Sequence, residues 1–207
     1  MINSREEWLK NRRGGIGGSD AAAVIGQNPW KTNQDLWREK TGRVIPPQID
    51  NEAVAYGKAA ESHLIELFKL DFPEWDVTPG GFNIIRNEKH PFLLATLDGS
   101  IVTPNGERGI LEIKTTTNPR SESWKDQIPQ NYYCQVLHYL GVTGWDFAIL
   151  KAQIKNTLGD LPTAFTKHYL FRRADVAEDI AYLQQKEVEF WQYVFNDIEP
   201  PLVLPGL

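Results

Sequence analysis

Three charged side chains near the middle of the chain could together do chemistry. Glu112 and Lys114 stand two residues apart in an apolar run, and side chains two apart in a strand project to the same face. Asp98 ends the preceding apolar segment, and a hairpin through residues 104–106 (Pro-Asn-Gly) would return the chain and bring Asp98 beside Glu112. The pattern therefore predicts two carboxylates and one ammonium at one edge of a sheet.

This set of groups suits the hydrolysis of a phosphodiester. Hard divalent cations such as Mg²⁺ prefer carboxylate oxygens and leave room for water and substrate phosphate. A lysine beside such a cation would orient or deprotonate the attacking water, or offset the charge that develops on the phosphate. The alternative is an Asp-Gly turn followed by a surface ion pair, and the rest of the chain must decide between the two.

Size and composition limit the class of protein. A chain of 207 residues fits one domain, and its single cysteine, Cys134, excludes a disulfide framework and a multi-cysteine metal site built by this chain alone. We find neither a leader nor an apolar run of membrane-spanning length, and so expect a cytoplasmic protein without a membrane segment. The net charge of −5 argues against nonspecific coating of nucleic acid, but not against local DNA binding.

Hydrophobic periodicity predicts the elements that must position these residues. The pattern favours a mixed sheet flanked by helices, which is an α/β (α+β) fold. We expect helices that open at Ser4 and at Thr32 and others at 21–25, 52–70, 128–141 and 174–195, and strands at 82–85, 92–97, 99–102, 110–114, 145–155 and 165–172. The strands between 82 and 114 read as an antiparallel meander. The expected core stripe of the helix at 52–70 is Ala60, Leu64, Leu67 and Phe68. That of the helix at 174–195 is Ile180, Leu183, Val188 and Trp191.

A glycine-rich segment near the N-terminus has the features of an anion site. Arg12 and Arg13 precede four glycines, and Ser19-Asp20 could cap the helix that follows. Guanidinium groups, free backbone N–H groups and a helix dipole all favour phosphate. A solvated arginine pair before a linker is the alternative.

Five motifs in chain order resemble the YqaJ-type viral recombinase family, which is similar to the exonuclease of phage lambda and falls in the PD-(D/E)xK nuclease superfamily. They are Trp8-x-x-x-Arg12 leading into Gly14–Ala22, then Gly57-x-x-x-Glu61, Leu97-Asp98-Gly99, Glu112-Ile113-Lys114-Thr115, and Gln135-x-x-x-Tyr139. The resemblance covers the chain from Trp8 to Tyr139.

The resemblance implies a restriction-endonuclease-like core and a metal-dependent deoxyribonuclease. We expect one nuclease domain over 1–207, with an N-terminal helical segment that binds DNA ends (1–50) and a nuclease core (51–200). The implied activity digests one strand of linear double-stranded DNA from the 5′ end and leaves a 3′ overhang for a single-strand annealing protein. The implied assembly is a homotrimeric ring in a bacterial or phage-infected cell. No nucleoside triphosphate is expected, because Gly14–Gly18 is not followed by the Lys-Ser/Thr of a phosphate-binding loop.

By the same resemblance, each motif has a role. Asp98, Glu112 and the backbone carbonyl of Ile113 would hold Mg²⁺, with Mn²⁺ as a substitute, and Glu61 would complete a second metal position. Lys114 and Gln135 would position water and the scissile phosphate. The residues expected to bind the terminal 5′-phosphate and DNA are Arg12, Ser19 and Trp8, with Arg13 as the alternative to Arg12; Arg5, Lys10, Arg120 and Lys125 are further candidates for duplex contacts. Tyr139 is either a supporting residue or core, and His138 receives no role.

Two other functions fit parts of this pattern. A RecB-like nuclease that trims single-stranded DNA has similar motifs at Glu61, Asp98, Glu112 and Gln135. A catalytically weak adaptor that binds DNA ends would keep the N-terminal motif, although the intact set of carboxylates disfavours it. A duplex with one labelled 5′ end separates the RecB-like nuclease from the 5′ exonuclease.

Overall fold

Two sheets form the framework of the molecule. The computed structural model describes the chain except residues 1–4, 48, 118–123, 125–126, 157–159 and 205–207. The helices are α1 (Arg5–Arg13), α2 (Gly18–Val24), α3 (Asn33–Lys40), α4 (Glu52–Asp71), α5 (Gln130–Thr143) and α6 (Ala177–Phe195). The strands are β1 (Ile16–Gly17), β2 (Asp76–Pro79), β3 (Ile85–Arg86), β4 (Leu93–Ala95), β5 (Gly99–Val102), β6 (Arg108–Thr117), β7 (Phe147–Asn156) and β8 (Thr163–Arg172). No helix in the described part of the chain is long and apolar enough to cross a membrane.

The larger sheet is mixed, as the sequence predicts. Its five strands run in the order β2-β5-β6-β7-β8. The central pair, β6 and β7, is parallel from Gly109 opposite Phe147 to Thr117 opposite Lys155, whereas the other neighbours are antiparallel. The crossover between the two parallel strands contains α5. The strand that carries Glu112 is therefore the centre of the sheet.

The smaller sheet corrects the expected meander. Strand β4 pairs with β1 in parallel and with β3 in antiparallel fashion, but not with β5. A two-residue strand around Gly17 has no periodicity to recognise, and all three residues of β4 are buried, so an alternating pattern could not place them. This pairing joins the N-terminal segment to the chain that leads into Asp98.

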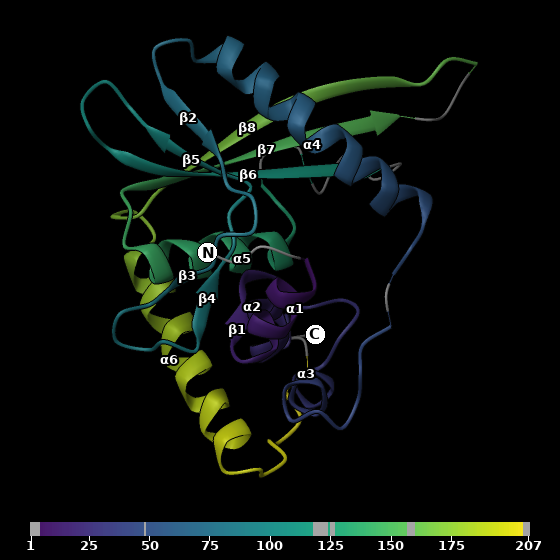
Figure 1. Cartoon of the computed structure of the whole chain (residues 1–207), viewed down its shortest axis with the longest axis vertical. Coiled ribbons are helices and arrows are strands. Elements are labelled where there is room, and N and C mark those ends of the chain that lie inside the picture. Colours follow the sequence, from purple (N-terminus) through teal and green to yellow (C-terminus); the bar gives the residue numbers. More distant parts are fainter. Residues whose placement is uncertain (1–4, 48, 118–123, 125–126, 157–159, 205–207) are drawn as a thin grey trace.

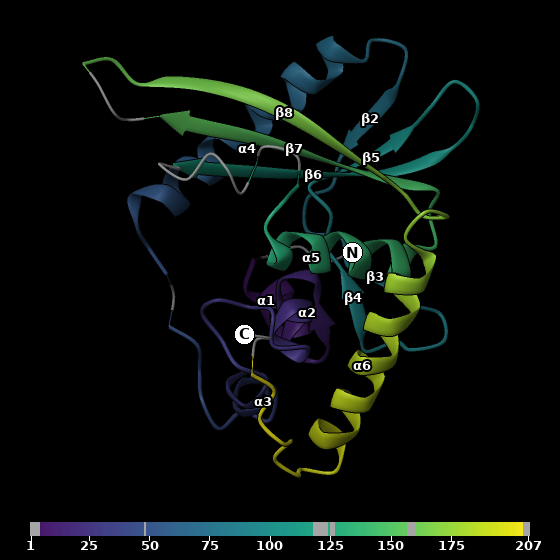
Figure 2. The ribbon, with the colours of Figure 1, turned by 180° about the vertical axis from the view of Figure 1, so that it is seen from behind.

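Helices cover both faces of the larger sheet, as Figures 1 and 2 show from opposite sides. Helix α4 lies on one face, where Leu64, Ile65 and Phe68 pack with Leu111 and Ile113. Helices α5, α2 and α6 lie on the other side of the sheet and share a core with Ile110, Ala148 and Leu150 of β6 and β7. Alternation along β6 therefore divides its apolar residues between two cores.

Two helix faces differ in part from the expected stripes. In α4, Leu67 is 48% exposed and Ile65 is buried, because the helix turns its Leu64–Ile65–Phe68 side to the sheet. In α6, Val188 and Trp191 are only partly buried, whereas Glu187 and Phe190 are buried. The Trp191 ring stacks on Phe92, with ring centroids 5.1 Å apart. Charge alone would have placed Glu187 on the solvent side.

Candidate active site

The hairpin between β5 and β6 brings Asp98 beside Glu112, as predicted. Gly99 pairs with Leu111, so Asp98 continues the register opposite Glu112. The Ile113 N–H also donates a hydrogen bond of 2.8 Å to Asp98 Oδ2. The backbone of β6 therefore fixes the Asp98 carboxylate next to the buried one.

Glu112 is the most enclosed charged group of the cluster, with 2% of its surface exposed. Its Oε1 accepts hydrogen bonds from Lys114 Nζ at 2.6 Å and from Gln135 Nε2 at 2.7 Å. Its Oε2 is buried without a hydrogen-bond partner. A buried carboxylate oxygen without a partner is costly, and it marks a position where a ligand can bind.

The electrostatics follow from crowding of these carboxylates in a buried place. Burial, followed by the charge of Asp98, raises the pKa of Glu112 to about 8, against the opposing effect of Lys114. Burial likewise raises the pKa of Asp98. Burial acts to lower the pKa of Lys114, but the Glu112 and Asp98 carboxylates raise it above its usual value, so Lys114 is held as an ammonium. The cluster therefore has two acidic side chains, Asp98 and Glu112, and one ammonium, Lys114.

Glu61 faces this cluster from α4 without joining it closely. Burial, then the charge of Asp98, raises the pKa of Glu61, while Lys114 lowers it. Gly57, one turn earlier, lets α4 approach β6, since a Cβ there would lie 3.1 Å from Thr115 Oγ1. Within the described residues no three Asp, Glu, His or Cys side chains form a group that could hold a metal ion. Glu61 is thus within electrostatic range but is not assembled with the other two.

Helix α5 supplies the polar groups above the carboxylates. Gln135 and Tyr139 are one turn apart and both buried. Gln135 Nε2 donates to Glu112 and also to Tyr139 Oη, at 3.1 Å. Burial and the charges of Glu112 and Asp98 raise the pKa of Tyr139, so its hydroxyl remains protonated. Tyr139 is therefore both core and part of the cluster's hydrogen-bond network.

The N-terminal residues also form one group. Arg12 Nη2 donates to Ser19 Oγ at 2.9 Å, and the Arg12 guanidinium carbon lies 4.7 Å from the centroid of the Trp8 ring. The Trp8 indole N–H is buried without a partner. Arg13 is exposed, and no contact between it and these side chains is found among the described residues. Arg12, rather than Arg13, therefore forms a group with Ser19 and Trp8.

The predicted cap of α2 at Ser19-Asp20 is confirmed for Asp20 but not for Ser19. Gly17, not Ser19, is the N-cap residue, and the Asp20 carboxylate accepts the Gly17 N–H at 3.1 Å. Lys40 Nζ lies 2.7 Å from the same Asp20 oxygen. Because Asp20 takes the capping role, the Ser19 hydroxyl remains directed at Arg12. The sequence offered no signal for Lys40, which is 20 positions away in the chain.

A close contact ties the N-terminal group to the carboxylate cluster. A Cβ on Gly18 would lie 2.5 Å from Tyr139 Cε1 and 2.9 Å from Gln135 Cγ, so only glycine fits between α2 and α5.

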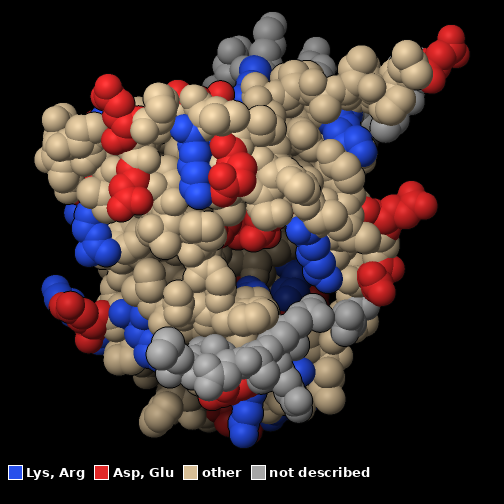
Figure 3. Space-filling model, turned by 45° about the horizontal axis from the view of Figure 1, so that its top comes forward, with Lys and Arg blue, Asp and Glu red and all other residues tan. Residues whose placement is uncertain are grey.

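The surface is hollowed on the face in Figure 3, and acidic and basic side chains gather around the opening. The expected DNA contacts Arg120 and Lys125 and the start of the first helix at Ser4 lie outside the described residues, and Lys10 is exposed.

The pKa of Glu112 leads to a pH prediction for protein free of divalent cations. Its folded pKa of about 8 exceeds the usual 4.5, so between these values the folded state holds a proton that the unfolded state releases, and the free energy of unfolding must fall as pH rises. Urea denaturation in EDTA across this pH range should show that the free energy of unfolding falls more steeply with pH for wild type than for Glu112→Gln. Equal slopes would contradict the buried, protonatable carboxylate.

The Gly18 contact leads to a second prediction. Gly18→Ala should lower the free energy of unfolding by about 1–3 kcal/mol, the usual cost of overpacking, and should perturb the Gln135 side-chain amide signals in NMR spectra. Gly14→Ala is the matched control, because a Cβ there meets only the Asn11 carbonyl oxygen at 3.5 Å. If the two variants were equally stable, the α2–α5 contact would be looser than described.

Comparisons with known structures agree with this fold. An alkaline exonuclease from Laribacter hongkongensis superposes with a TM-score of 0.69 at 21% identity, and the match covers 94% of each chain. The same enzyme in complex with dAMP superposes with a TM-score of 0.67 at 20% identity, again over 94% of each chain. A phage-related exonuclease from Haemophilus somnus 129PT gives 0.61 at 13% identity, covering 88% of this chain and 96% of the other. The chain thus shares its fold with these exonucleases.

Sequence comparisons give the family. Protein YqaJ of Bacillus subtilis (strain 168) is 36% identical over 189 residues, which are 91% of this chain but only 56% of the relative's length. The chain therefore spans little more than half of that relative. The model of the YqaJ-like viral recombinase domain matches residues 7–146, a range that contains the N-terminal group, the carboxylate cluster and Gln135. The chain belongs to the YqaJ-like viral recombinase domain family.

Proposed function

We propose that this protein is a metal-dependent exonuclease that degrades one strand of linear double-stranded DNA from its 5′ end. The observation that carries the proposal is the Glu112 carboxylate, buried beside Asp98 with one oxygen unpartnered and its pKa raised to about 8. Such a group is poised to exchange its proton for a cation. The exonuclease fold and the family membership support the same reaction class.

The donor set fits a hard divalent cation such as Mg²⁺. Asp98 and Glu112 would hold it, with the Ile113 carbonyl as a further ligand and Glu61 at a second position. Carboxylate and carbonyl oxygens are the ligands that Mg²⁺ prefers, and Mn²⁺ accepts the same set. When bound, the ions supply Lewis acidity and lower the pKa of a water molecule.

The remaining steps belong to side chains of this chain. Lys114 Nζ, an ammonium held at Glu112 and 5.1 Å from the Tyr132 ring centroid, would offset charge that develops on the scissile phosphate. Gln135 fixes the orientation of the Glu112 carboxylate through Oε1 and leaves Oε2 open. Attack by water on phosphorus breaks the bond to the leaving 3′ oxygen, which takes up a proton; no covalent enzyme intermediate is needed.

The N-terminal group would bind the 5′-phosphate of the strand that is cut. Arg12 and the Ser19 hydroxyl form a paired donor set for a dianion, and the partnerless indole N–H of Trp8 is a further donor close to Arg12. The Gly18 contact with Tyr139 and Gln135 would hold this group at a fixed distance from Glu112. A fixed distance between end binding and cleavage is what stepwise removal of nucleotides requires.

Assembly and partners follow from the resemblance to viral recombinases. The chain would act as a homotrimeric ring around the duplex, since a small enzyme without a motor remains on DNA through many cleavages only if copies surround it. The 3′ overhang would pass to a single-strand annealing protein. Light scattering at working concentration should give the mass of three chains; monomers that digest processively would overturn the ring.

A direct assay tests the reaction. Purified protein should shorten a linear duplex from labelled 5′ ends in Mg²⁺ and not in EDTA. Asp98→Ala should lower the rate at least about 10³-fold, because a metal ligand is lost. The variant should still bind duplex ends, because the substitution also relieves the repulsion between carboxylates. Preference for single strands would favour a RecB-like nuclease. End binding by wild type without cleavage would favour an adaptor.

End recognition is tested by a double-mutant cycle between protein and DNA. Arg12→Ala should slow digestion of 5′-phosphorylated ends by roughly 10- to 150-fold, the equivalent of a charge-assisted hydrogen bond of about 1.5–3 kcal/mol. On 5′-hydroxyl ends the same change should matter much less, and the difference is the coupling energy. Arg13→Ala is the matched control and should behave alike on both ends. Equal losses for Arg12→Ala on both ends would make Arg12 a general backbone contact.

A further inference from the structure

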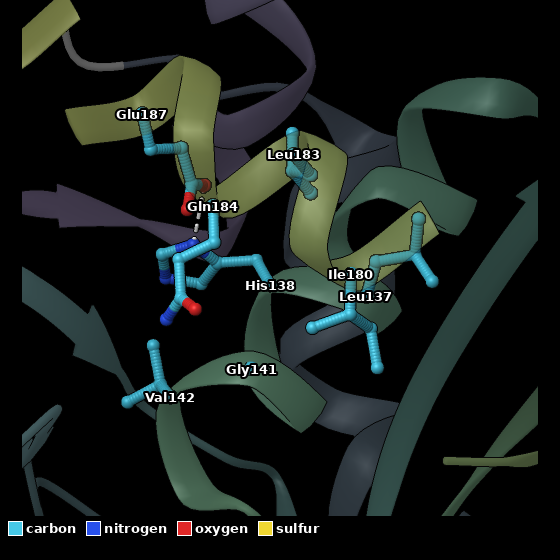
Figure 4. Close-up of a pocket in the computed structure, with 8 residues that line it drawn as sticks. All are labelled: Leu137, His138, Gly141, Val142, Ile180, Leu183, Gln184 and Glu187. Atoms are coloured by element: carbon cyan, nitrogen blue, oxygen red, sulfur yellow. Dashed lines mark hydrogen bonds and ion pairs between the residues drawn. The ribbon is translucent and has the colours of Figure 1, made fainter. Parts of the chain in front are cut away.

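A buried histidine on α5 has both ring nitrogens bound, and none of the roles above uses it. His138 is 2% exposed. Its Nδ1 lies 2.6 Å from Glu187 Oε1 on α6, and its Nε2 lies 2.9 Å from the backbone carbonyl oxygen of Leu94 on β4. Figure 4 shows the His138 ring directed from α5 at the Glu187 carboxylate, with Gln184 beside it.

The partners determine the charge of this ring. A carbonyl oxygen only accepts, so Nε2 carries a proton, and a carboxylate faces Nδ1. Burial acts to lower the pKa of His138, but the charge and hydrogen bond of Glu187, the bond to Leu94 and the more distant charge of Asp20 raise it above its usual value. His138 and Glu187 therefore form a buried pair in which the charge of Glu187 favours the protonated ring.

The pair lies where three functional elements meet. Gln135 stands one turn before His138 on the same helix, and Asp98 follows Leu94 by four residues. Leu94 is also paired with Gly17, the N-cap of the helix that carries Ser19. His138 thus joins the helix of Gln135 to the strand that leads into Asp98, and that strand is in turn paired with β1.

Packing alone does not account for charges at this position. An ion pair buried in a core adds little stability over apolar residues of equal volume, because both groups lose their hydration. Hydrogen bonds differ from apolar contacts in direction, and two of them on opposite sides of one ring fix the rotation of α5 about its axis. Rotation of α5 is what sets the position of Gln135 against Glu112.

We propose that His138 and Glu187 are positioning residues of the nuclease site, which hold α5 against β4 so that Gln135 and Tyr139 lie at Glu112. This inference rests on the proposed function for its kinetic consequence, but its structural consequence is independent of activity. A misplacement of about 1 Å at a reacting group is enough to lower turnover up to about 10²-fold.

The test compares two core variants of the same helix. His138→Phe keeps an aromatic ring and removes both hydrogen bonds, whereas Leu137→Ala is the matched control, a neighbouring buried residue that lines the same pocket. Per folded molecule, at saturating duplex and Mg²⁺, His138→Phe should lower kcat about 10-fold or more with KM for DNA within about twofold. Leu137→Ala should lower Tm and retain kcat.

Two further measurements keep the proposal falsifiable. His138→Gln, which keeps an N–H donor for Leu94, should recover part of the kcat lost in His138→Phe, and Glu187→Gln should reproduce part of the loss if His138→Phe fails to fold. In NMR spectra the Gln135 side-chain amide signals should shift in His138→Phe and Glu187→Gln but not in Leu137→Ala.

The outcomes separate this proposal from the proposed function. Equal kcat in His138→Phe and Leu137→Ala, with Gln135 amide signals unchanged, would overturn the positioning role. If wild type cleaves no DNA, the proposed function fails, while the Gln135 signals still decide whether His138 and Glu187 position that side chain.

Discussion

The burial of one carboxylate on a central strand is the constraint on which the site depends. Glu112 lies in β6 between two apolar cores, where an ionised group is costly unless it is paired. Lys114 and Gln135 both donate hydrogen bonds to Oε1 of Glu112, and Oε2 has no partner. The β5–β6 hairpin adds a second carboxylate instead of a second cation. The protein thus maintains two acidic side chains at a place where stability alone would favour apolar residues, as expected at a functional site.

Polar contacts, not apolar ones, fix the parts of the molecule that surround this carboxylate. Asp20 and Lys40 set the start of α2, and His138 and Glu187 set α5 against β4 and α6. Apolar faces hold elements together but allow them to slide or rotate, because dispersion and hydrophobic forces have little direction. Hydrogen bonds to buried charges specify one arrangement. The buried pairs lie on the N-terminal and α5 sides of the site, where small rotations would matter most.

The N-terminal segment and helix α5 meet through a glycine. Gly18 allows the start of α2 to lie against the Tyr139 ring and the Gln135 stem. The group of Arg12 and Ser19 and the cluster of Glu112 are therefore joined by one close packing contact. In a nuclease that acts at DNA ends, such a contact would make the distance between the bound end and the cleaved bond a property of the fold.

The sequence by itself determined the features that depend on local pattern. The alternation around Glu112 and Lys114, the turn before β6, and the long helices follow from periodicity and turn residues, and the motifs located Gln135 and Tyr139. Only the tertiary structure decided which apolar surfaces meet: β4 pairs with β1 and not β5, and Ile65 rather than Leu67 faces the sheet. The partners of His138 are 49 and 44 positions away in the chain. Periodicity shows which side of an element is buried, but many apolar faces are interchangeable. The pairing between distant elements is therefore settled by shape complementarity and by buried hydrogen bonds, which exist only once the chain has folded.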